Sequence, residues 1–288
     1  MGSLMNGPTR SERAVKVGER EIFVGELGEG APLVMLHGGG PGASGLGNFS
    51  RNTTALAERF RLIVPDLPGY GRSTKALDRN DPFADLARSI LGLLDALDVR
   101  KAHVLGNSLG GACALRLALE APERVDRLVL LGPGGIDTSR RPPTEGLLHL
   151  LDYYSGEGPT RAKCEQFLRR DLVFDGDALP ASVVEARYQA SLDPEVVANP
   201  PLVRPKDLPD PRVLDLTLDP RLGALEAPTL VLWGVEDRVN PASGGRSLQE
   251  RMPNCDLFLF SRTGHWVQWE RAAEFNAAAN AHLAAGQA

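Results

Sequence analysis

A serine flanked by glycines is the first candidate for chemistry in this sequence. The segment Gly106-Asn107-Ser108-Leu109-Gly110 has the form G-x-S-x-G and joins an apolar strand pattern to a helical pattern. That context holds a serine on a sharp strand-to-helix turn, where side chains in place of the glycines would collide. The helix start beyond the turn supplies N–H groups and positive potential where an oxyanion forms. The motif therefore predicts a nucleophilic serine, with a helix-capping serine as the alternative.

A nucleophilic serine needs a base and an acid that orients the base, in the chain order Ser, Asp or Glu, His for this turn. Asp237 follows the predicted strand 228–234, and its neighbour Glu236 is a competing acid. His265 lies between the predicted final strand 255–261 and the last helical pattern. Both positions reach the carboxyl edge of a parallel sheet. The other histidines fit less well, lying in a glycine loop, at a strand start, in an inserted block and in the last helix: His37, His103, His149 and His282.

The glycine loop "HGGGPGASG", residues 37–45, allows two interpretations. Residues 40–45 match G-x-G-x-x-G, and Asp66 follows at about the 20-residue offset of a ribose-binding acid. A dinucleotide turn, however, leads directly into its helix, whereas helical pattern here begins only near residues 50–52. No G-K-[ST] follows either. The loop is better explained as a set of backbone N–H donors that join Leu109 in an oxyanion hole.

Strand and helix patterns alternate around these motifs. A strand pair over 14–18 and 20–28 is followed by the alternation, which continues to about residue 135 and resumes from about 213. This order predicts a mostly parallel sheet with helices on both faces. Between the two parts lie helical patterns over 144–154, 160–172 and 180–192 and a proline-rich connector, 199–212. We therefore expect a core domain of residues 1–135 and 213–288 and a helical lid of residues 136–212.

Composition excludes several other classes of protein. The chain has 288 residues, is 42% hydrophobic and carries a formal net charge of −5, which argues against nucleic-acid and anionic-membrane partners. No apolar run approaches the roughly 18 residues of a membrane span. The three cysteines and five histidines show no metal-ligand spacing. The cysteines are therefore expected to be free thiols. Because the N-terminus lacks an apolar signal core, we also expect a short disordered start and a cytoplasmic protein.

Together these motifs resemble those of the α/β-hydrolases, and more narrowly those of the meta-cleavage product hydrolases. That family splits a C–C bond in vinylogous 1,5-diketones formed by ring opening of catechols. The resemblance rests on the segments "LHGGGPGASG", "NFSRN", "DLPGYGRS", "GNSLGG", "LVLLGPGG", "WGVEDRVNP" and "GHWVQWE". It covers the first half and the last fifth of the chain and is looser over 136–228. It implies an eight-stranded, mostly parallel sheet with an inserted helical lid.

The resemblance also implies roles for individual residues. The triad would be Ser108, Asp237 and His265, and the oxyanion donors Gly39 and Leu109. The substrate-binding set would be Gly38, Gly40, Asn48, Asn107, Phe174, Arg187 and Trp266. Arg187 would pair with the substrate carboxylate, and Phe174 would line either the acyl-side pocket or the lid core. The resemblance implies no cofactor and no metal. It does imply a homodimer or a higher homo-oligomer.

The expected reaction is hydrolysis of a 2-hydroxy-6-oxo-hexa-2,4-dienoate type ring-cleavage product of aromatic or steroid catabolism. The products would be a 2-hydroxydienoate and a carboxylic acid. Two alternatives stay open. The same triad serves an ester or lactone hydrolase or a biosynthetic enzyme of this fold, which the divergent connector 197–212 favours. The second alternative is a nucleotide-binding or non-catalytic protein that uses the fold only as a scaffold. The intact Ser–Asp–His set argues against it, because a scaffold does not require all three residues.

Overall fold

A computed structural model describes residues 10–205 and 210–285, so the chain start and part of the connector 199–212 lie outside the described residues. Its centre is an eight-stranded sheet in the order β1-β2-β4-β3-β5-β6-β7-β8. The strands are β1 (Arg10–Val17), β2 (Arg20–Leu27), β3 (Ala31–Leu36), β4 (Phe60–Pro65), β5 (Ala102–Asn107), β6 (Val125–Leu131), β7 (Thr229–Gly234) and β8 (Cys255–Phe260). β2 is antiparallel to β1 and β4, and the other neighbouring strands are parallel. The predicted α/β fold with a mostly parallel eight-stranded sheet is confirmed.

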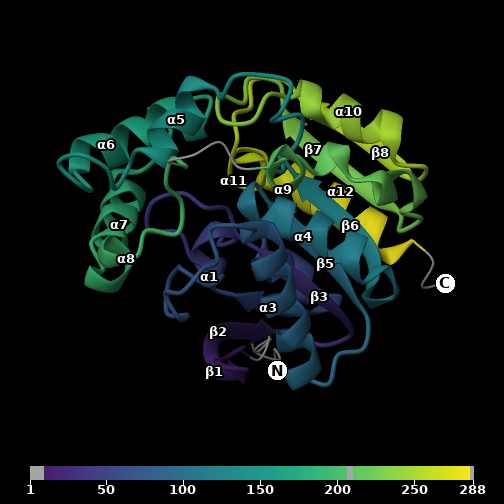
Figure 1. Cartoon of the computed structure of the whole chain (residues 1–288). Helices are drawn as coiled ribbons and strands as arrows, with labels where there is room; N and C mark the ends of the chain where they lie inside the picture. The colour runs from purple at the N-terminus through teal and green to yellow at the C-terminus, as the bar shows by residue number, and fades with distance from the viewer. Residues whose placement is uncertain (1–9, 206–209, 286–288) are drawn as a thin grey trace, which may run out of the picture.

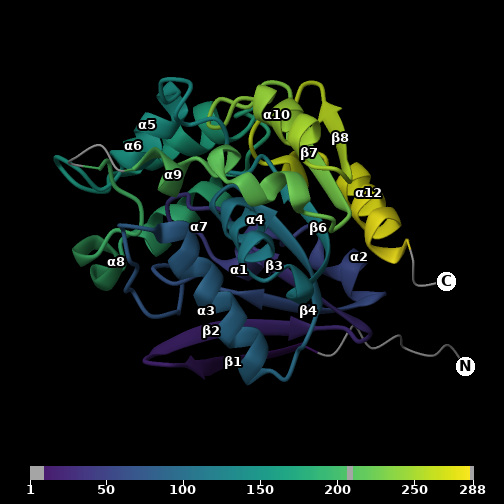
Figure 2. The same cartoon turned by 45° about the vertical axis from the view of Figure 1, so that its right-hand side comes forward.

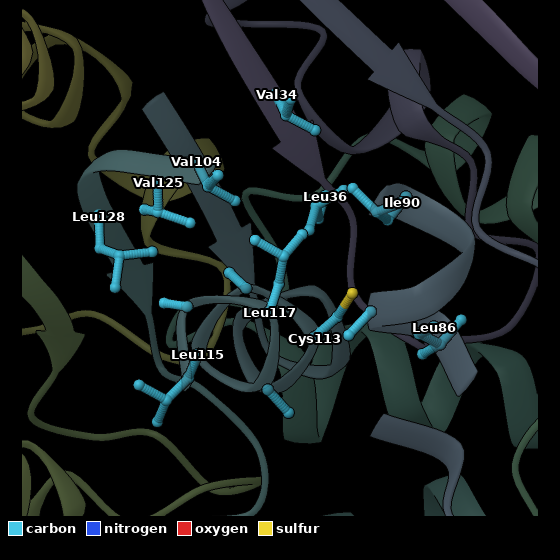
Figure 3. Close-up of a cluster of buried hydrophobic side chains, with 14 of the residues drawn as sticks. Val34, Leu36, Leu86, Ile90, Val104, Cys113, Leu115, Leu117, Val125 and Leu128 are labelled. Carbon is cyan, nitrogen blue, oxygen red and sulfur yellow. The ribbon is translucent and has the colours of Figure 1, made fainter. Parts of the chain in front are cut away.

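Helices cover both faces of the sheet (Figures 1 and 2). One face packs against α3 (Pro82–Ala96), α4 (Leu109–Glu120) and α10 (Ser243–Arg251), and the other against α2 (Thr53–Ala57) and α12 (Ala272–Ala284). Because both faces are covered, every residue of β5 is buried, including its polar residues His103 and Asn107. Figure 3 shows how side chains of α4, including Cys113 and Leu117, meet those of β3 and α3 in this core.

Several element boundaries differ from those the sequence predicts: β1 begins at Arg10 instead of residue 14, and the helices beside the glycine loop and His265 differ as well. The glycine loop leads into α1 (Gly45–Asn48), one turn that begins before the predicted start near residues 50–52. Its first N–H is bound by the side chain of Asp66, 2.7 Å away, which no local pattern reveals. The predicted last helix is two helices, α11 (Val267–Glu270) and α12, because Arg271 leaves helical geometry at φ −121° and ψ 43°.

The inserted block is helical, as predicted. It contains α5 (Glu145–Leu151), α6 (Arg161–Gln166), a π-helix η2 (Phe167–Leu172), α7 (Ala181–Ser191) and an unpredicted α8 (Pro194–Ala198). These helices gather on one side of the molecule (Figure 1). All of them except α8 contribute to an apolar cluster that includes Trp266 and Trp269. The remaining short helices are η1 (Pro122–Arg124), α9 (Pro211–Leu214), η3 (Leu216–Leu218) and η4 (Pro220–Ala224). Within the described ranges, no helix has the length and apolar character needed to cross a bilayer.

Candidate active site

The turn between β5 and α4 holds Ser108 in strained geometry. Ser108 has φ 54° and ψ −114°, a region that non-glycine residues rarely occupy. Such a backbone conformation costs about 1–3 kcal/mol. A Cβ atom added at Gly106 would lie 2.2 Å from the carbonyl oxygen of Gly110. A Cβ atom added at Gly110 would lie 2.2 Å from the carbonyl oxygen of Leu36. Gly106 is therefore required by a contact within the turn, and Gly110 by the close approach of the end of β3.

Asp237 and His265 form a buried pair at the ends of β7 and β8. The Nδ1 atom of His265 lies 2.7 Å from Oδ2 of Asp237, and the side chains are 3% and 0% exposed. The other carboxylate oxygen, Oδ1, accepts the backbone N–H groups of Val239 and Asn240 at 2.8 and 2.9 Å. The indole N–H of Trp233 donates to Oδ2 at 3.0 Å. Three protein N–H donors thus hold the carboxylate that orients the imidazole.

Glu236, the competing acid, is occupied elsewhere. Its Oε2 atom accepts the backbone N–H of Thr263 at 3.0 Å. The structure therefore brings Asp237, rather than its neighbour, to His265.

The glycine loop is fixed by two residues whose role sequence patterns do not reveal. The Nε2 atom of His37 accepts the N–H of Leu67 at 2.8 Å, and its Nδ1 lies 2.8 Å from the carbonyl oxygen of Gly38. This pattern requires a neutral ring with the proton on Nδ1, and burial lowers the pKa of His37 accordingly. The hydroxyl of Tyr70 donates to the carbonyl oxygen of Gly39 at 3.1 Å. The peptide groups of Gly38 and Gly39 are therefore oriented by the first side chain of the loop and by a tyrosine beyond β4.

Asp66, which the dinucleotide interpretation would assign to a ribose, is fully engaged by the backbone. Its Oδ1 accepts the N–H of Gly45 at 2.7 Å and its Oδ2 the N–H of Arg72 at 2.9 Å. A Cβ atom at Gly71 would lie 2.2 Å from Oδ2, so the following turn closes tightly around the carboxylate. Asp66 therefore joins the glycine loop to the turn after β4.

The two expected oxyanion donors lie against each other. Leu109 is the first residue of α4, so its N–H has no partner within the helix. In the described ranges, the N–H of Gly39 donates to no protein acceptor. A Cβ atom at Gly39 would lie 3.2 Å from a side-chain carbon of Leu109 and 2.5 Å from one of Leu202. The bare glycine backbone is what permits this close approach.

A pocket brings most of the predicted residues together. It is lined by Gly38, Gly39, Gly40, Asn48, Asn107, Ser108, Leu150, Phe167, Leu172, Arg187, His265 and Trp266. The indole N–H of Trp266 donates to Oδ1 of Asn48 at 3.1 Å, which leaves the buried Nδ2 of Asn48 without a partner in the described structure. The side-chain N–H of Asn107 donates to the carbonyl oxygen of Leu131 at 3.2 Å.

Arg187 supplies a positive charge to this pocket. Its Nε donates to the carbonyl oxygen of Pro41 at 2.6 Å, and its guanidinium carbon lies 5.7 Å from the centre of the Trp266 ring. Among the described residues, no carboxylate forms an ion pair with it. Burial lowers the pKa of this guanidinium. An arginine in this state has free donors for an anionic group.

The apolar wall of the pocket was missed by sequence reasoning. Phe167 and Leu172 lie five residues apart on the π-helix, whose hydrogen bonds run from i to i+5. A search for the 3.6-residue helical period does not detect that spacing, and Leu150 on α5 carries no distinguishing signal. Phe174 is absent from the lining residues; its ring lies 5.3 Å from the guanidinium carbon of Arg262. Of the groups of His, Cys, Asp and Glu in the described ranges, none could hold a metal ion.

The sheet order, the strained serine turn and the inserted helices define the class of the α/β-hydrolases. A family model described as the alpha/beta hydrolase fold matches residues 31–172. A 2-hydroxy-6-oxononadienedioate/2-hydroxy-6-oxononatrienedioate hydrolase of Comamonas testosteroni is 39% identical over 260 residues, 88% of each chain. A 2-hydroxy-6-oxo-6-phenylhexa-2,4-dienoate hydrolase of the same species is 36% identical over 285 residues, 96% of each chain. The chain belongs to the meta-cleavage product hydrolase family, as its motifs predicted.

Solved structures agree with this assignment. A meta-cleavage product hydrolase from Pseudomonas fluorescens IP01 superposes with a TM-score of 0.83 at 31% identity, covering 93% of this chain and 95% of the other. A 2-hydroxy-6-oxo-6-phenylhexa-2,4-dienoate hydrolase from Rhodococcus sp. strain RHA1 has a TM-score of 0.82 at 28% identity, covering 96% of this chain and 100% of the other. The protein is therefore an enzyme of this hydrolase family.

Proposed function

We propose that this enzyme hydrolyses the C–C bond of a 2-hydroxy-6-oxo-hexa-2,4-dienoate type product of aromatic or steroid ring cleavage. The products are a 2-hydroxydienoate and a carboxylic acid. The observation that carries the proposal is Arg187, which forms no ion pair within residues 10–205 and 210–285 and lines the same pocket as Ser108 and His265. A cation in that position suits a substrate whose carboxylate lies in the same pocket as the bond to be cleaved, at the other end of the dienoate. An ester hydrolase acting on neutral substrates has no use for it.

The polar end of the pocket binds the dienoate. Arg187 pairs with the carboxylate, and Asn107 and the free Nδ2 of Asn48 offer donors to the oxygens of the dienoate. Trp266 supports this end through its bond to Asn48. Gly38 and Gly40 let the substrate approach the backbone closely. Held in this way, and with His265 moving a proton, the 2-hydroxy-dienoate tautomerises to its keto form.

Cleavage then proceeds through Ser108. His265 takes the hydroxyl proton while Oγ attacks the C6 ketone, and the N–H groups of Gly39 and Leu109 hold the resulting oxyanion. When the tetrahedral adduct collapses, the C5–C6 bond breaks and its electron pair passes into a dienolate. Protonated His265 returns its proton to the C2 oxygen of this dienolate, which gives the 2-hydroxydienoate. Water, deprotonated by His265, then attacks the acyl-serine and releases the carboxylic acid.

Residues 136–212 act in this scheme as a lid that shapes the acyl side. Leu150, Phe167 and Leu172 come from this segment and give the pocket an apolar wall. Such a wall suits an alkyl or aryl group on C6. The Phe174 side chain, beside Arg262, then affects the lid surface more than the acyl pocket.

The cysteines and one exposed side chain of the sheet support a cytoplasmic location and a homo-oligomeric state. Cys113, Cys164 and Cys255 are free, which suits the reducing cytoplasm. The edge strand β8 presents Phe258, 52% exposed, which supports association into a homodimer or higher homo-oligomer.

The test uses the natural colour of 2-hydroxy-6-oxo-dienoates. Wild-type enzyme should remove the colour of a panel of such acids with varied C6 groups, whereas Ser108→Ala should bind them and not cleave them. Rapid loss of colour with Ser108→Ala would exclude the serine as nucleophile. If wild-type enzyme hydrolyses simple aryl esters far faster than any dienone acid, the ester or lactone assignment replaces this one.

A further inference from the structure

The lid touches the loop that carries His265 through backbone atoms. The N–H groups of His265 and Trp266 both donate to the carbonyl oxygen of Leu172, at 2.8 and 3.1 Å. Contact is close there, since a Cβ atom at Gly264 would lie 2.8 Å from the nitrogen of Phe174. The side chain of Leu172 also lines the pocket. One lid peptide thus contacts both the substrate space and the loop of the candidate base.

A single carboxylate completes this junction. Oε2 of Glu270 accepts the N–H of Phe174 at 2.7 Å, and Oε1 accepts the N–H of Gly264 at 2.9 Å. A glutamate that merely caps a helix serves backbone donors at the start of its own helix. Glu270, at the end of α11, does interact with the backbone of Trp266 at the start of that helix, but it also joins a lid residue to the residue immediately before His265.

We propose that Glu270 is a positioning residue that fixes the His265 loop to the lid, so that lid seating and alignment of the base depend on the same side chain. This inference rests on the proposed role of His265 as the base. Glu270 touches neither the pocket nor the imidazole, so it acts through the peptide groups of Gly264 and Phe174.

The chemistry of the junction requires two acceptors. A carboxylate offers one oxygen to each N–H group, and such charge-assisted bonds are stronger than neutral ones. A glutamine of the same shape keeps one acceptor and turns its NH₂ toward the other N–H, which leaves a buried donor unpaired. Burial raises the pKa of Glu270 to about 7, so this carboxylate occupies a place that disfavours its charge. The substitution Glu270→Gln therefore breaks one half of the junction with little change in volume.

The experiment compares Glu270→Gln with Glu274→Gln, a carboxylate on α12 that pairs with Arg271 at the surface. Two measurements are made on each: steady-state kcat and KM for a dienone acid at pH 8, and the rate constant for labelling of Ser108 by a fluorophosphonate. The labelling rate constant does not depend on how much of a sample is folded. For Glu270→Gln we expect both kcat and the labelling rate constant to fall about 10- to 100-fold, as for loss of a bond to a charged group, with KM within about twofold. Glu274→Gln should match wild type.

Two outcomes would overturn the inference. If Glu270→Gln labels and turns over at the wild-type rate, Glu270 does not position the base. If KM rises while kcat and the rate constant for labelling of Ser108 stay at their wild-type values, Glu270 shapes only the lid. Failure of the proposed function is recognised separately, because it appears in wild type: a labelled Ser108 with no dienone hydrolysis rejects the substrate, and no labelling rejects the triad.

Discussion

The Oδ2 atom of Asp237 lies 2.7 Å from Nδ1 of His265, with neither side chain more than 3% exposed. This contact fixes the histidine tautomer, since Nδ1 must carry the proton that Asp237 accepts. The other ring nitrogen, Nε2, is then unprotonated and able to accept a proton. Besides His265, the N–H groups of Trp233, Val239 and Asn240 donate to this carboxylate and hold it in place.

Replacing Asp237 by asparagine should reverse that tautomer preference. We expect kcat for a dienone acid to fall by roughly 10³- to 10⁴-fold for Asp237→Asn, because the amide favours the tautomer of His265 that carries its proton on Nε2. Steady-state assays with active-site titration give the measurement. Glu236→Gln is the matched control and should retain most of the activity, since Glu236 binds only the Thr263 peptide. A larger loss in the control than in Asp237→Asn would transfer the role to Glu236.

The serine turn should not tolerate a methyl group at its first glycine. In Gly106→Ala the new Cβ would lie 2.2 Å from the carbonyl oxygen of Gly110, so backbone must move. We expect a loss of about 2–4 kcal/mol in the free energy of unfolding, measured by urea denaturation. Gly223→Ala, whose new Cβ would meet its nearest atom at 3.7 Å, should change it by less than about 0.5 kcal/mol. Equal stability of the two variants would contradict this account of the turn.

Arg187→Gln should discriminate between substrates with and without a carboxylate. For a dienone acid we expect kcat/KM to fall about 10- to 100-fold, because a charge-assisted bond to the carboxylate is lost. Hydrolysis of a neutral aryl ester should fall less than about threefold, since it makes no such bond. Arg161→Gln, on the lid surface, is the control and should leave both rates unchanged. An equal fall for both substrates would show that Arg187 acts through the Pro41 carbonyl and the glycine loop instead.

The raised pKa of Glu270 predicts how stability depends on pH. Between the usual value of 4.5 and the native value of about 7, the folded protein binds a proton that the unfolded chain has released. Stability from this group is therefore full below pH 4.5 and declines as pH rises to 7, by up to about 3 kcal/mol. The charged group that acts on it is Asp237, which raises this pKa further.

Glu270→Gln should remove this decline, so its free energy of unfolding should vary less between pH 5 and 7 than that of wild type. Chemical denaturation at several pH values measures the difference. Glu274→Gln should keep the wild-type slope in that window, because the hydrogen bond from Arg271 lowers the pKa of Glu274. A wild-type slope in Glu270→Gln would mean that another group titrates there.

Local pattern was sufficient to predict the sheet and the elements that bear the triad candidates. Buried parallel strands are apolar runs, and a helix such as α3 carries its own start signal, Asp81 followed by Pro82. The α/β-hydrolase class and its family followed from motifs in the loops after those strands. A predicted helix boundary was wrong where a side chain distant in the sequence determines it, as Asp66 does for the start of α1.

The lid side of the pocket required the folded structure. Which face of a short helix meets the substrate depends on packing against other elements, and the π-helix places Phe167 and Leu172 together at an unfamiliar spacing. The residues that hold the glycine loop were equally hidden. His37 and Tyr70 act through hydrogen bonds to peptide groups, and such bonds leave no periodic pattern in the sequence.

The hydrogen bonds from His265 and Trp266 to the Leu172 carbonyl have a consequence for the diversification of this enzyme. They involve only main-chain atoms, so the Leu172 side chain is free to vary while its peptide plane is not. Changes of substrate range would thus accumulate as side-chain exchanges on a lid whose anchoring peptide stays in place. Chimeras that graft a relative's lid should have their junctions outside residues 167–174, because a crossover within that segment would separate the new pocket wall from the loop of the base.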